Sequence, residues 1–343
     1  MRATSFNLDW RYMAGANGFI DDLNGQTAAA VAAVTLPHDG MILSERSPDV
    51  RNGGLTGYYP GGTYTYTKRF FVPEAWAGKD VAFEFEGVYM NAFVYINDDY
   101  AGNRPYGYSN FVIPANDLLR YGQDNEIRVV AKAGMEKTSR WYSGGGIYRN
   151  VHLYVADPLH IAMNGLRITT PAIGDDAAQA VVDVTVENTG RSVRRLVIRT
   201  EVLDAEGRVV DTVESPMTAY SATTNRQRER MTLPQPRLWN CETPYLYQCR
   251  VTLLEAGEPV DQSQSAFGVR RLQLDVAHGL RINGEVVNLR GACIHHDNGI
   301  IGAVTLERAE ERRVEQLKAA GFNCIRSAHN PMSRAMLDAC DRL

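Results

Sequence analysis

A strand, helix, strand pattern near the end of the sequence places the strongest constraint on the fold. One short apolar run ends at Ile294, a helical stretch follows it, and a second apolar run occupies residues 322–325. Polar side chains come directly after both runs. In a parallel β/α arrangement, the loops that follow the strands open on one face of the sheet, where ligands bind. The pattern therefore predicts one wall of a binding site.

The polar side chains after the two runs are the candidate site residues. They are His295, His296, Asp297, Arg326, His329 and Asn330. Adjacent residues of an extended segment point to opposite faces, so we do not expect His295 and His296 to share a metal ion, and we predict no metal site. A simpler interpretation stays open, in which His296 only forms a hydrogen bond in its loop and Arg326 is a structural ion-pair residue.

The composition argues against some classes of partner. The 343 residues carry a formal net charge of −4, with 44% apolar and 22% charged residues. These values are ordinary for a globular protein of two or three domains and favour neither nucleic acid nor an anionic membrane. No apolar run approaches the roughly 20 residues that span a bilayer, and the first residues lack the apolar core of a signal peptide. We therefore expect a cytoplasmic protein with no nucleic acid or membrane partner.

The cysteines give a second indication of the compartment. There are 5 of them, widely spaced and without a CxxC pair. This pattern favours free thiols in a reducing compartment over a disulfide framework or a zinc site. Each cysteine has apolar neighbours, which is typical of buried thiols rather than of a catalytic nucleophile.

Residues 1–157 show the alternation of apolar and polar residues that is typical of antiparallel strands. Residues 81–86 alternate strictly, and residues 97–99 suit a hairpin turn. We therefore predict an all-β sandwich, in which His38 and Asp39 terminate a strand.

Residues 158–272 predict a second sandwich, of the immunoglobulin-like kind. Residues 182–187 and 196–202 alternate and flank a turn at 188–191. Further short strands bring this unit to roughly 100 residues, the usual size of an immunoglobulin-like domain. We see no catalytic constellation here and interpret the unit as a spacer.

Residues 273–343 change from strand to helix periodicity. We predict a strand at 286–294, a helix that Thr305 caps and Gly321 ends, and a second helix capped by Ser333. The glutamates of the first helix are expected to be helical and solvent-facing; they are Glu307, Glu310, Glu311 and Glu315. None of them is therefore assigned as a catalytic acid or nucleophile.

A series of short motifs runs along nearly the whole chain. The early ones are Leu36-Pro37-His38-Asp39, Phe85-Glu86-Gly87-Val88-Tyr89-Met90-Asn91, the run from Arg140 to Val151, and Phe267-Gly268-Val269-Arg270. The late ones are Arg290-Gly291, His295-His296-Asp297, Gly321-Phe322-Asn323, Ile325-Arg326 and Ala328-His329-Asn330-Pro331. In kind and order they resemble glycoside hydrolase family 2, which contains β-galactosidases, β-glucuronidases and β-mannosidases, and they are closest to its β-galactosidase branch.

The resemblance implies a mostly β, multidomain fold. It comprises a jelly-roll sugar-binding domain at 1–157, an immunoglobulin-like β-sandwich at 158–272 and the start of a (β/α)8 TIM barrel at 273–343. A complete barrel takes about 250 residues, so only two β/α units fit after His278 and we expect a truncated barrel. The family retains configuration and uses two glutamates from later strands as acid/base and nucleophile. We expect both beyond Leu343, assign no catalytic residue here, and predict that this chain alone is inactive.

The resemblance also implies binding roles. His295 and His329 correspond to histidines that hydrogen-bond sugar hydroxyls, and Arg326 corresponds to an arginine that keeps the nucleophilic carboxylate ionised and oriented. Arg140 and Trp141 lie in a glycine-rich segment that suits stacking on a pyranose, with a tightly packed corner of the sandwich as the alternative.

The function expected from the resemblance is retaining exo-hydrolysis of terminal β-D-galactosides. The alternatives are a β-glucuronidase or β-mannosidase of the same family, or a non-catalytic carbohydrate-binding protein. Asn330 stands where the best-known β-galactosidases have tyrosine, a departure from the pattern on which their substrate contacts depend. We expect a β-linked sugar as partner and a homo-oligomer. No cofactor is predicted, although a divalent or sodium cation remains open for a full-length enzyme.

Overall fold

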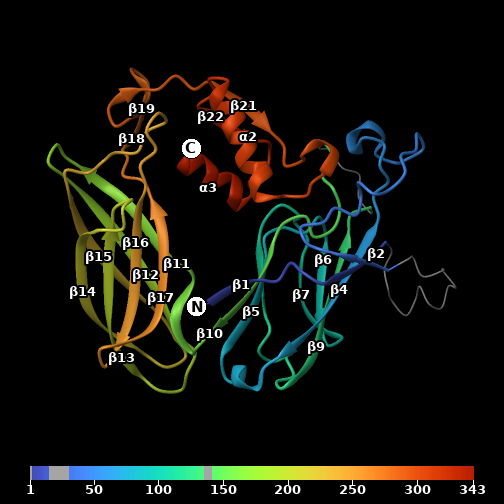
Figure 1. Ribbon diagram of the computed structural model, residues 1–343, viewed down its shortest axis with the longest axis horizontal. Helices are drawn as coiled ribbons and strands as arrows, with labels where there is room; N and C mark the ends of the chain where they lie inside the picture. Colours follow the sequence, from blue (N-terminus) through green and yellow to red (C-terminus); the bar gives the residue numbers. More distant parts are fainter. Residues whose placement is uncertain (1, 15–30, 135–140) are drawn as a thin grey trace.

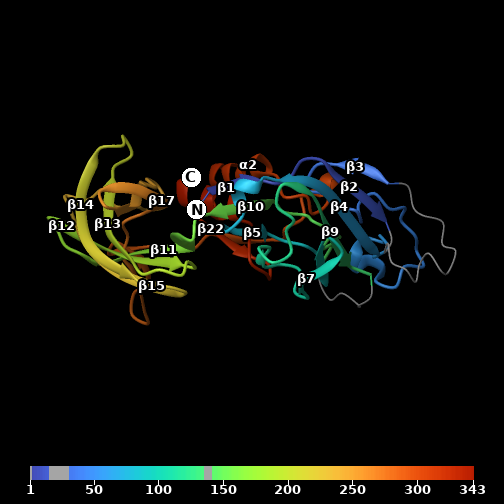
Figure 2. The same cartoon turned by 90° about the horizontal axis from the view of Figure 1, so that it is seen from below.

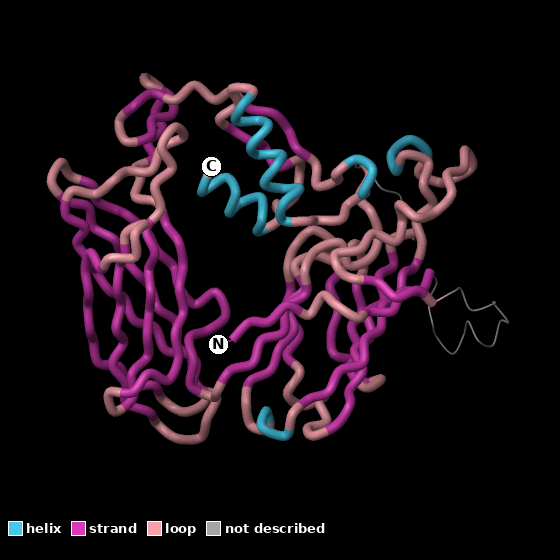
Figure 3. Tube along the Cα trace, viewed as in Figure 1, coloured by secondary structure: helices cyan, strands magenta, loops and turns pink. Residues whose placement is uncertain are grey.

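The computed structural model describes residues 2–14, 31–134 and 141–343, which fold mostly into β-strands. Two sandwiches lie side by side, and the part that contains the carboxyl terminus lies against them (Figure 1). Among the described residues, the α-helices belong to this last part, and the other helical segments in Figure 3 are short 3-10 turns. No helix within the described ranges is long and apolar enough to cross a membrane. The predicted mostly β, multidomain fold is confirmed.

The first sandwich is the jelly roll and contains a four-stranded and a six-stranded antiparallel sheet. The four-stranded sheet consists, in order, of β1 (Arg2–Ser5), β10 (Val151–Ala156), β5 (Asp80–Phe85) and β8 (Phe111–Pro114). The six-stranded sheet consists of β3 (Ala32–Val34), β2 (Trp10–Ala14), β4 (Thr63–Val72), β9 (Gln123–Lys132), β6 (Ala92–Ile96) and β7 (Asp99–Arg104).

Strand alternation builds the core of this sandwich, as predicted. Val81, Phe83 and Phe85 of β5 point inward and are buried, since alternate residues of a strand share a face. The predicted hairpin turn joins β6 to β7, where Asn97 and Asp98 have positive φ angles of 53° and 70°. Two left-handed residues in succession match the twist of a tight hairpin, and Asn and Asp tolerate this conformation.

The second sandwich is the immunoglobulin-like one and also has two antiparallel sheets (Figure 2). Its four-stranded sheet consists of β14 (Val209–Ala219), β13 (Arg194–Leu203), β16 (Tyr247–Glu255) and β17 (Glu258–Phe267). Its three-stranded sheet consists of β11 (Leu159–Ile173), β12 (Ala177–Asn188) and β15 (Thr223–Pro234). Val182, Ile198 and Leu253 are fully buried between the two sheets.

The third part begins with a small antiparallel sheet and continues as the start of the barrel. The small sheet consists of β18 (Leu272–Asp275), β19 (Gly279–Ile282) and β20 (Glu285–Val286). The barrel part consists of the parallel pair β21 (Gly291–Ile294) and β22 (Cys324–Ser327), with α2 (Glu307–Ala319) and α3 (Arg334–Arg342). Short 3-10 turns are η1 (Gly53–Thr56), η2 (Glu74–Trp76) and η3 (Gly299–Ile301).

Two boundaries of the third part differ from the sequence-based prediction. The barrel strand begins at Gly291 and not at residue 286, because Val286 pairs with β19 in the small sheet. The residue that caps α2 is Leu306 and not Thr305, whose hydroxyl donates a hydrogen bond to the carbonyl of Ala303. Thr305 therefore stabilises the loop before the helix rather than the first turn.

The prediction that the glutamates of α2 all face solvent is wrong for Glu310. Its side chain is 2% exposed, because it accepts a hydrogen bond from Ser333 and pairs with Arg313 at 3.2 Å. The predicted caps are confirmed at two other positions. Ser333 accepts from the N–H of Met336 at the start of α3, and Gly321 follows α2 with a φ of 84°.

Candidate functional site

Three of the predicted site residues meet where β21 and β22 end. Ile294 pairs with Ser327 in the parallel register, so the segments after both strands leave the sheet at one edge. Nη1 of Arg326 lies 2.8 Å from Nδ1 of His329. The rings of His295 and His329 lie 5.9 Å apart between centroids. Polar groups after neighbouring parallel strands thus form one cluster.

The contact between Arg326 and His329 determines which hydrogen-bonding group His329 can present to a ligand. A guanidinium is always protonated and only donates hydrogen bonds, so Nδ1 of His329 is the acceptor. The proton of a neutral imidazole then lies on Nε2. His329 therefore presents an N–H donor at its outer edge.

His296 points away from this cluster into the jelly roll. Its Nε2 donates to the carbonyl oxygen of Ser143 over 3.0 Å, and its ring packs between Tyr108 and Tyr148 at 5.1 and 5.3 Å. Burial lowers the pKa of His296 to about 4, so the ring is neutral at physiological pH. The structure therefore places His296 at the contact between jelly roll and barrel loop.

Two half-exposed aromatic side chains of the jelly roll reach the barrel loops. The indole N–H of Trp141 lies 3.4 Å from Oδ2 of Asp297, and the hydroxyl of Tyr106 donates to Oδ1 of Asn330 over 3.1 Å. Asp297 and Asn330 each follow shortly after a histidine of the cluster. Trp141 and Tyr106 therefore lie at the rim of the site, and Arg140 lies outside the described residues.

Asp39 is a buried connection that the sequence analysis missed. Its carboxylate is 1% exposed and accepts four hydrogen bonds. Three come from the jelly roll, from the N–H groups of Met41 and Gly145 and the hydroxyl of Tyr142, and the fourth comes from the N–H of Ala303 over 2.8 Å. Burial and the charge of Asp39 raise the pKa of Tyr142, so its hydroxyl stays protonated and donates.

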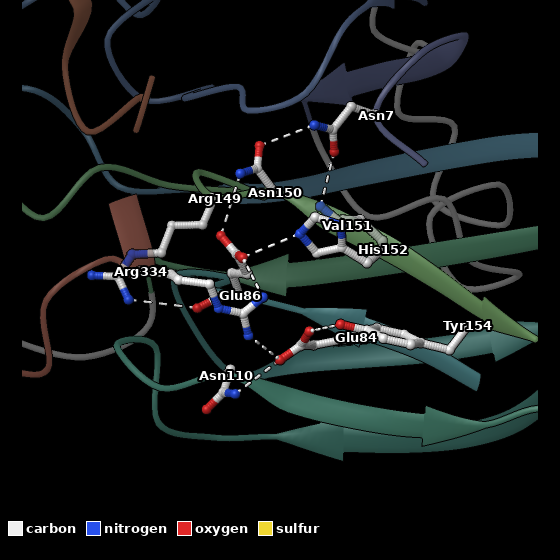
Figure 4. A network of polar contacts seen from close by, with 10 residues as sticks. All are labelled: Asn7, Glu84, Glu86, Asn110, Arg149, Asn150, Val151, His152, Tyr154 and Arg334. Carbon is white, nitrogen blue, oxygen red and sulfur yellow. Dashed lines mark hydrogen bonds and ion pairs between the residues drawn. The ribbon is translucent and has the colours of Figure 1, made fainter. Parts of the chain in front are cut away.

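A second connection joins α3 to the jelly roll (Figure 4). Arg334, in the first turn of α3, pairs with Glu84 at 3.0 Å and with Glu86 at 3.3 Å. Both carboxylates are buried, and each has further donors, with Tyr154 on Glu84 and His152 on Glu86. Buried charges are tolerated only when they are paired and hydrogen-bonded in this way.

The charges around Glu86 keep it ionised. Burial alone raises the pKa of a carboxyl, but the hydrogen bond from His152 and the charges of Arg334 and Arg149 outweigh it and hold the pKa of Glu86 below its ordinary value. Arg149 also donates from Nη2 to the carbonyl oxygen of Pro331 over 2.9 Å. The segment between β22 and α3, which carries His329, is therefore held by the jelly roll at Pro331 and, through Arg334, at the start of α3.

The assembled side chains suit a hydroxyl-rich ligand. Imidazole, guanidinium, amide and carboxylate groups provide several donors and acceptors within one cluster. Within the described ranges, no group of three or more His, Cys, Asp or Glu residues could hold a metal ion.

Comparisons with known proteins identify the family. The family described as "Glycosyl hydrolases family 2" matches residues 159–270, and the TIM barrel domain of that family matches residues 276–343. The β-galactosidase BoGH2A of Bacteroides ovatus is 36% identical over 99% of this chain and 40% of its own length. A putative β-glucuronidase of Formosa agariphila is 32% identical over 99% of this chain and 32% of its own length.

A solved structure agrees with these matches. The crystal structure of a glycosyl hydrolase family 2 member from Bacteroides cellulosilyticus has a TM-score of 0.93 and 35% identity, covering 100% of this chain and 45% of that one. The chain thus spans less than half the length of each of these three relatives. On the evidence of its fold, its motifs and both family matches, the chain belongs to glycosyl hydrolase family 2.

Proposed function

We propose that this chain forms the sugar-binding wall of a retaining exo-glycosidase that hydrolyses terminal β-D-galactosides. The observation that supports this best is the convergence of His295, Arg326 and His329 beyond two parallel strands. In α/β barrels, catalytic sites lie at this end of the strands. A cluster of hydrogen-bonding groups at this place suits a polyhydroxylated ligand.

The proposed roles are those that the family resemblance implies, and the geometry of the cluster supports them. His329 donates from Nε2 to a sugar hydroxyl, and His295 provides a second imidazole within reach of the same ring. Hydrogen bonds to sugar hydroxyls that strengthen in the oxocarbenium-like transition state contribute several kcal/mol. Arg326 keeps its positive charge and holds a nucleophilic carboxylate ionised. In this proposal both catalytic glutamates lie outside the chain described here.

The jelly roll supplies the rim of the proposed pocket. Trp141 offers an aromatic face for stacking on a pyranose, and its contact with Asp297 fixes the ring. Asp297 and Asn330 add polar groups for hydroxyls, and Arg140 is kept as a proposed contact. His296 supports this rim through its bond to Ser143, which lies two residues after Trp141.

A β-glucuronidase is the second candidate, because a relative with 32% identity carries that name. The relative named β-galactosidase has the higher identity of the two, 36%. We therefore favour the galactoside. A β-mannosidase and a non-catalytic carbohydrate-binding protein are the remaining alternatives.

A panel of nitrophenyl β-glycosides tests the proposal on the intact protein that contains this chain. We expect turnover of the β-galactoside and no turnover by the isolated 343-residue chain. Preferential turnover of the β-glucuronide would transfer the assignment to the second candidate. Turnover of none of the glycosides, with retained binding of galactose, would support the non-catalytic alternative.

The proposal also covers the domain boundaries, the cellular location, the oligomeric state and a cation. We propose domain boundaries at 1–157, 158–272 and 273–343, which are supported by the strand ends at Ala156 and Phe267. We propose a cytoplasmic location, supported by the five cysteines, all of which are free. We propose a homo-oligomer, which light scattering of the intact protein tests. A divalent or sodium cation at the site stays an open alternative, and chelator treatment of the intact protein tests the divalent one.

A further inference from the structure

A row of arginines lies on the outer face of the sheet β11–β12–β15. Arg226, Arg228 and Arg230 alternate along β15, and all three are exposed. Alternate residues of a strand share a face and lie roughly 6.6 Å apart. Arg167 of β11 joins the same face, because it pairs in register with Asp183 of β12, which in turn pairs with Arg228.

The positive charge of this face is only partly compensated. Asp183 lies at its centre and is bound by Arg228 through Nε at 2.6 Å and Nη2 at 3.3 Å. Glu187, further along β12, pairs with His160. Asp183 and Glu187 together cannot neutralise four guanidinium groups, so the face is positive although the whole chain carries a net charge of −4.

The arginines border a shallow, open groove on this face. Three hollows of about 580, 330 and 560 Å³ follow one another along the sheet. The first two share Arg167, Asp183 and Arg228, and the second and third share Pro171 and Gln179. The shared residues make the hollows continuous, which suits a linear ligand.

The lining indicates the chemical class of that ligand. None of the described residues that line the three hollows is aromatic. Single-stranded nucleic acids depend on aromatic side chains for stacking, and an aromatic face is also the usual platform for a neutral sugar ring. Arginine forks instead bind planar or tetrahedral anions through paired hydrogen bonds. The groove therefore suits a linear polymer whose negative charges lie on carboxylate or sulfate groups.

We propose that this groove binds a linear acidic polysaccharide, either carboxylated or sulfated. The site lies in the second sandwich and is separate from the histidine cluster of the barrel. It adds a polymer-binding function to this sandwich, which otherwise acts only as a spacer. The proposal holds whichever terminal sugar the barrel accepts.

Affinity gel electrophoresis of the chain tests the proposal, with polygalacturonate or dextran sulfate in the gel. We expect retardation by at least one of these polymers, which weakens as salt is raised because the contacts are ionic. Neutral dextran should cause none. The double variant Arg226→Gln/Arg230→Gln should bind at least tenfold more weakly, and Arg226→Lys/Arg230→Lys, which keeps the charge but loses the fork, should lie in between.

The matched control removes two arginines from the other sheet of the same sandwich. Arg199→Gln/Arg250→Gln changes the net charge equally, but these side chains are paired with Glu214 and Glu201. The control should bind like the original chain. The proposal fails if no acidic polymer retards the chain at low salt, or if Arg226→Gln/Arg230→Gln and the control Arg199→Gln/Arg250→Gln lose affinity equally. It also fails if a single-stranded oligodeoxynucleotide binds as tightly as the polysaccharide.

Discussion

Nη1 of Arg326 donates a hydrogen bond to Nδ1 of His329 over 2.8 Å, and this contact couples the charge of the arginine to the orientation of the histidine. A doubly protonated imidazole would place a donor against a donor, so the contact requires the neutral ring. The ring of His295 meets that of His329 edge to face, at 80°. This contact restricts the two rings relative to each other, and such a restriction reduces the conformational entropy that is lost when a ligand binds.

Removing either imidazole should lower catalysis by the intact protein. We expect His329→Ala and His295→Ala each to reduce kcat/KM for a β-galactoside about 100-fold, because each removes a hydrogen bond that strengthens in the transition state. The matched control is His278→Ala, since His278 is exposed and bonds to Asp275 in the small sheet. Steady-state kinetics measures the effect, and unchanged kcat/KM in both variants would exclude these histidines from the site.

Replacing Trp141 should weaken binding of the sugar more than it slows turnover. Trp141→Ala removes the stacking face and should raise KM about tenfold, whereas Trp141→Phe keeps a ring but loses the hydrogen bond to Asp297 and should have a smaller effect. Tyr100→Ala is a suitable control, because Tyr100 is an exposed aromatic residue of β7 that bonds to Asn103. Equal KM values for Trp141→Ala and the unchanged protein would place Trp141 outside the pocket.

The strands and the helix ends could be predicted from the sequence, because they depend on local periodicity. Alternation marked β5 and the strands of the second sandwich, and Ser333 and Gly321 marked helix ends, because each of these features is decided by residues a few positions apart. The cluster of His295, Arg326 and His329 followed from one topological rule on parallel strands.

The contacts between domains could not be predicted in this way. Asp39 and Ala303 are 264 positions apart, and Glu84 and Arg334 are 250 apart. From the sequence, Asp39 is predicted to terminate a strand, because a single acidic residue gives no periodic pattern from which a distant partner could be inferred. Glu310 was misplaced for a related reason, because its partner Ser333 belongs to the next helix. Which buried charges are paired is decided by the packing of the domains.

Acid should destabilise the protein through His296. A histidine in an unfolded chain titrates near 6.5, whereas the folded state holds the pKa of His296 at about 4. Between pH 6.5 and pH 4, His296 is protonated in the unfolded chain but stays neutral in the folded chain, so protonation favours unfolding. The stability that the neutral His296 contributes is therefore complete above pH 6.5 and is lost as the pH falls towards 4. The difference corresponds to about 3 kcal/mol.

Urea unfolding at pH 7 and pH 4 measures this contribution. The free energy of unfolding should fall about 3 kcal/mol more for the unchanged chain than for His296→Gln, whose amide can still donate to Ser143 but does not titrate. Parallel pH dependences of the two proteins would show that His296 is protonated in the folded state.

The carboxylate of Asp39 should be the most sensitive point of the contact between jelly roll and barrel. Asp39→Asn keeps the shape but replaces one oxygen with an amide donor, which then faces either the N–H groups of Met41 and Gly145 or the donors from Tyr142 and Ala303. Buried donors without acceptors cost about 1–3 kcal/mol each, so we expect a loss of roughly 3 kcal/mol in the free energy of unfolding.

Two further variants, Tyr142→Phe and Asp49→Asn, show whether the loss of stability comes from the carboxylate of Asp39 or from any change in this part of the chain. Tyr142→Phe removes one donor and leaves the carboxylate with three others, so it should cost only about 1 kcal/mol. Asp49→Asn, at an exposed position ten residues further along, should have no measurable effect. Because Asp39 also holds Ala303, Asp39→Asn should in addition expose the loop around η3 to limited proteolysis, while Tyr142→Phe should not. Equal stability of Asp39→Asn and Asp49→Asn would show that the four hydrogen bonds contribute nothing net, and that the barrel segment is held to the jelly roll by Arg334 and its two glutamates instead.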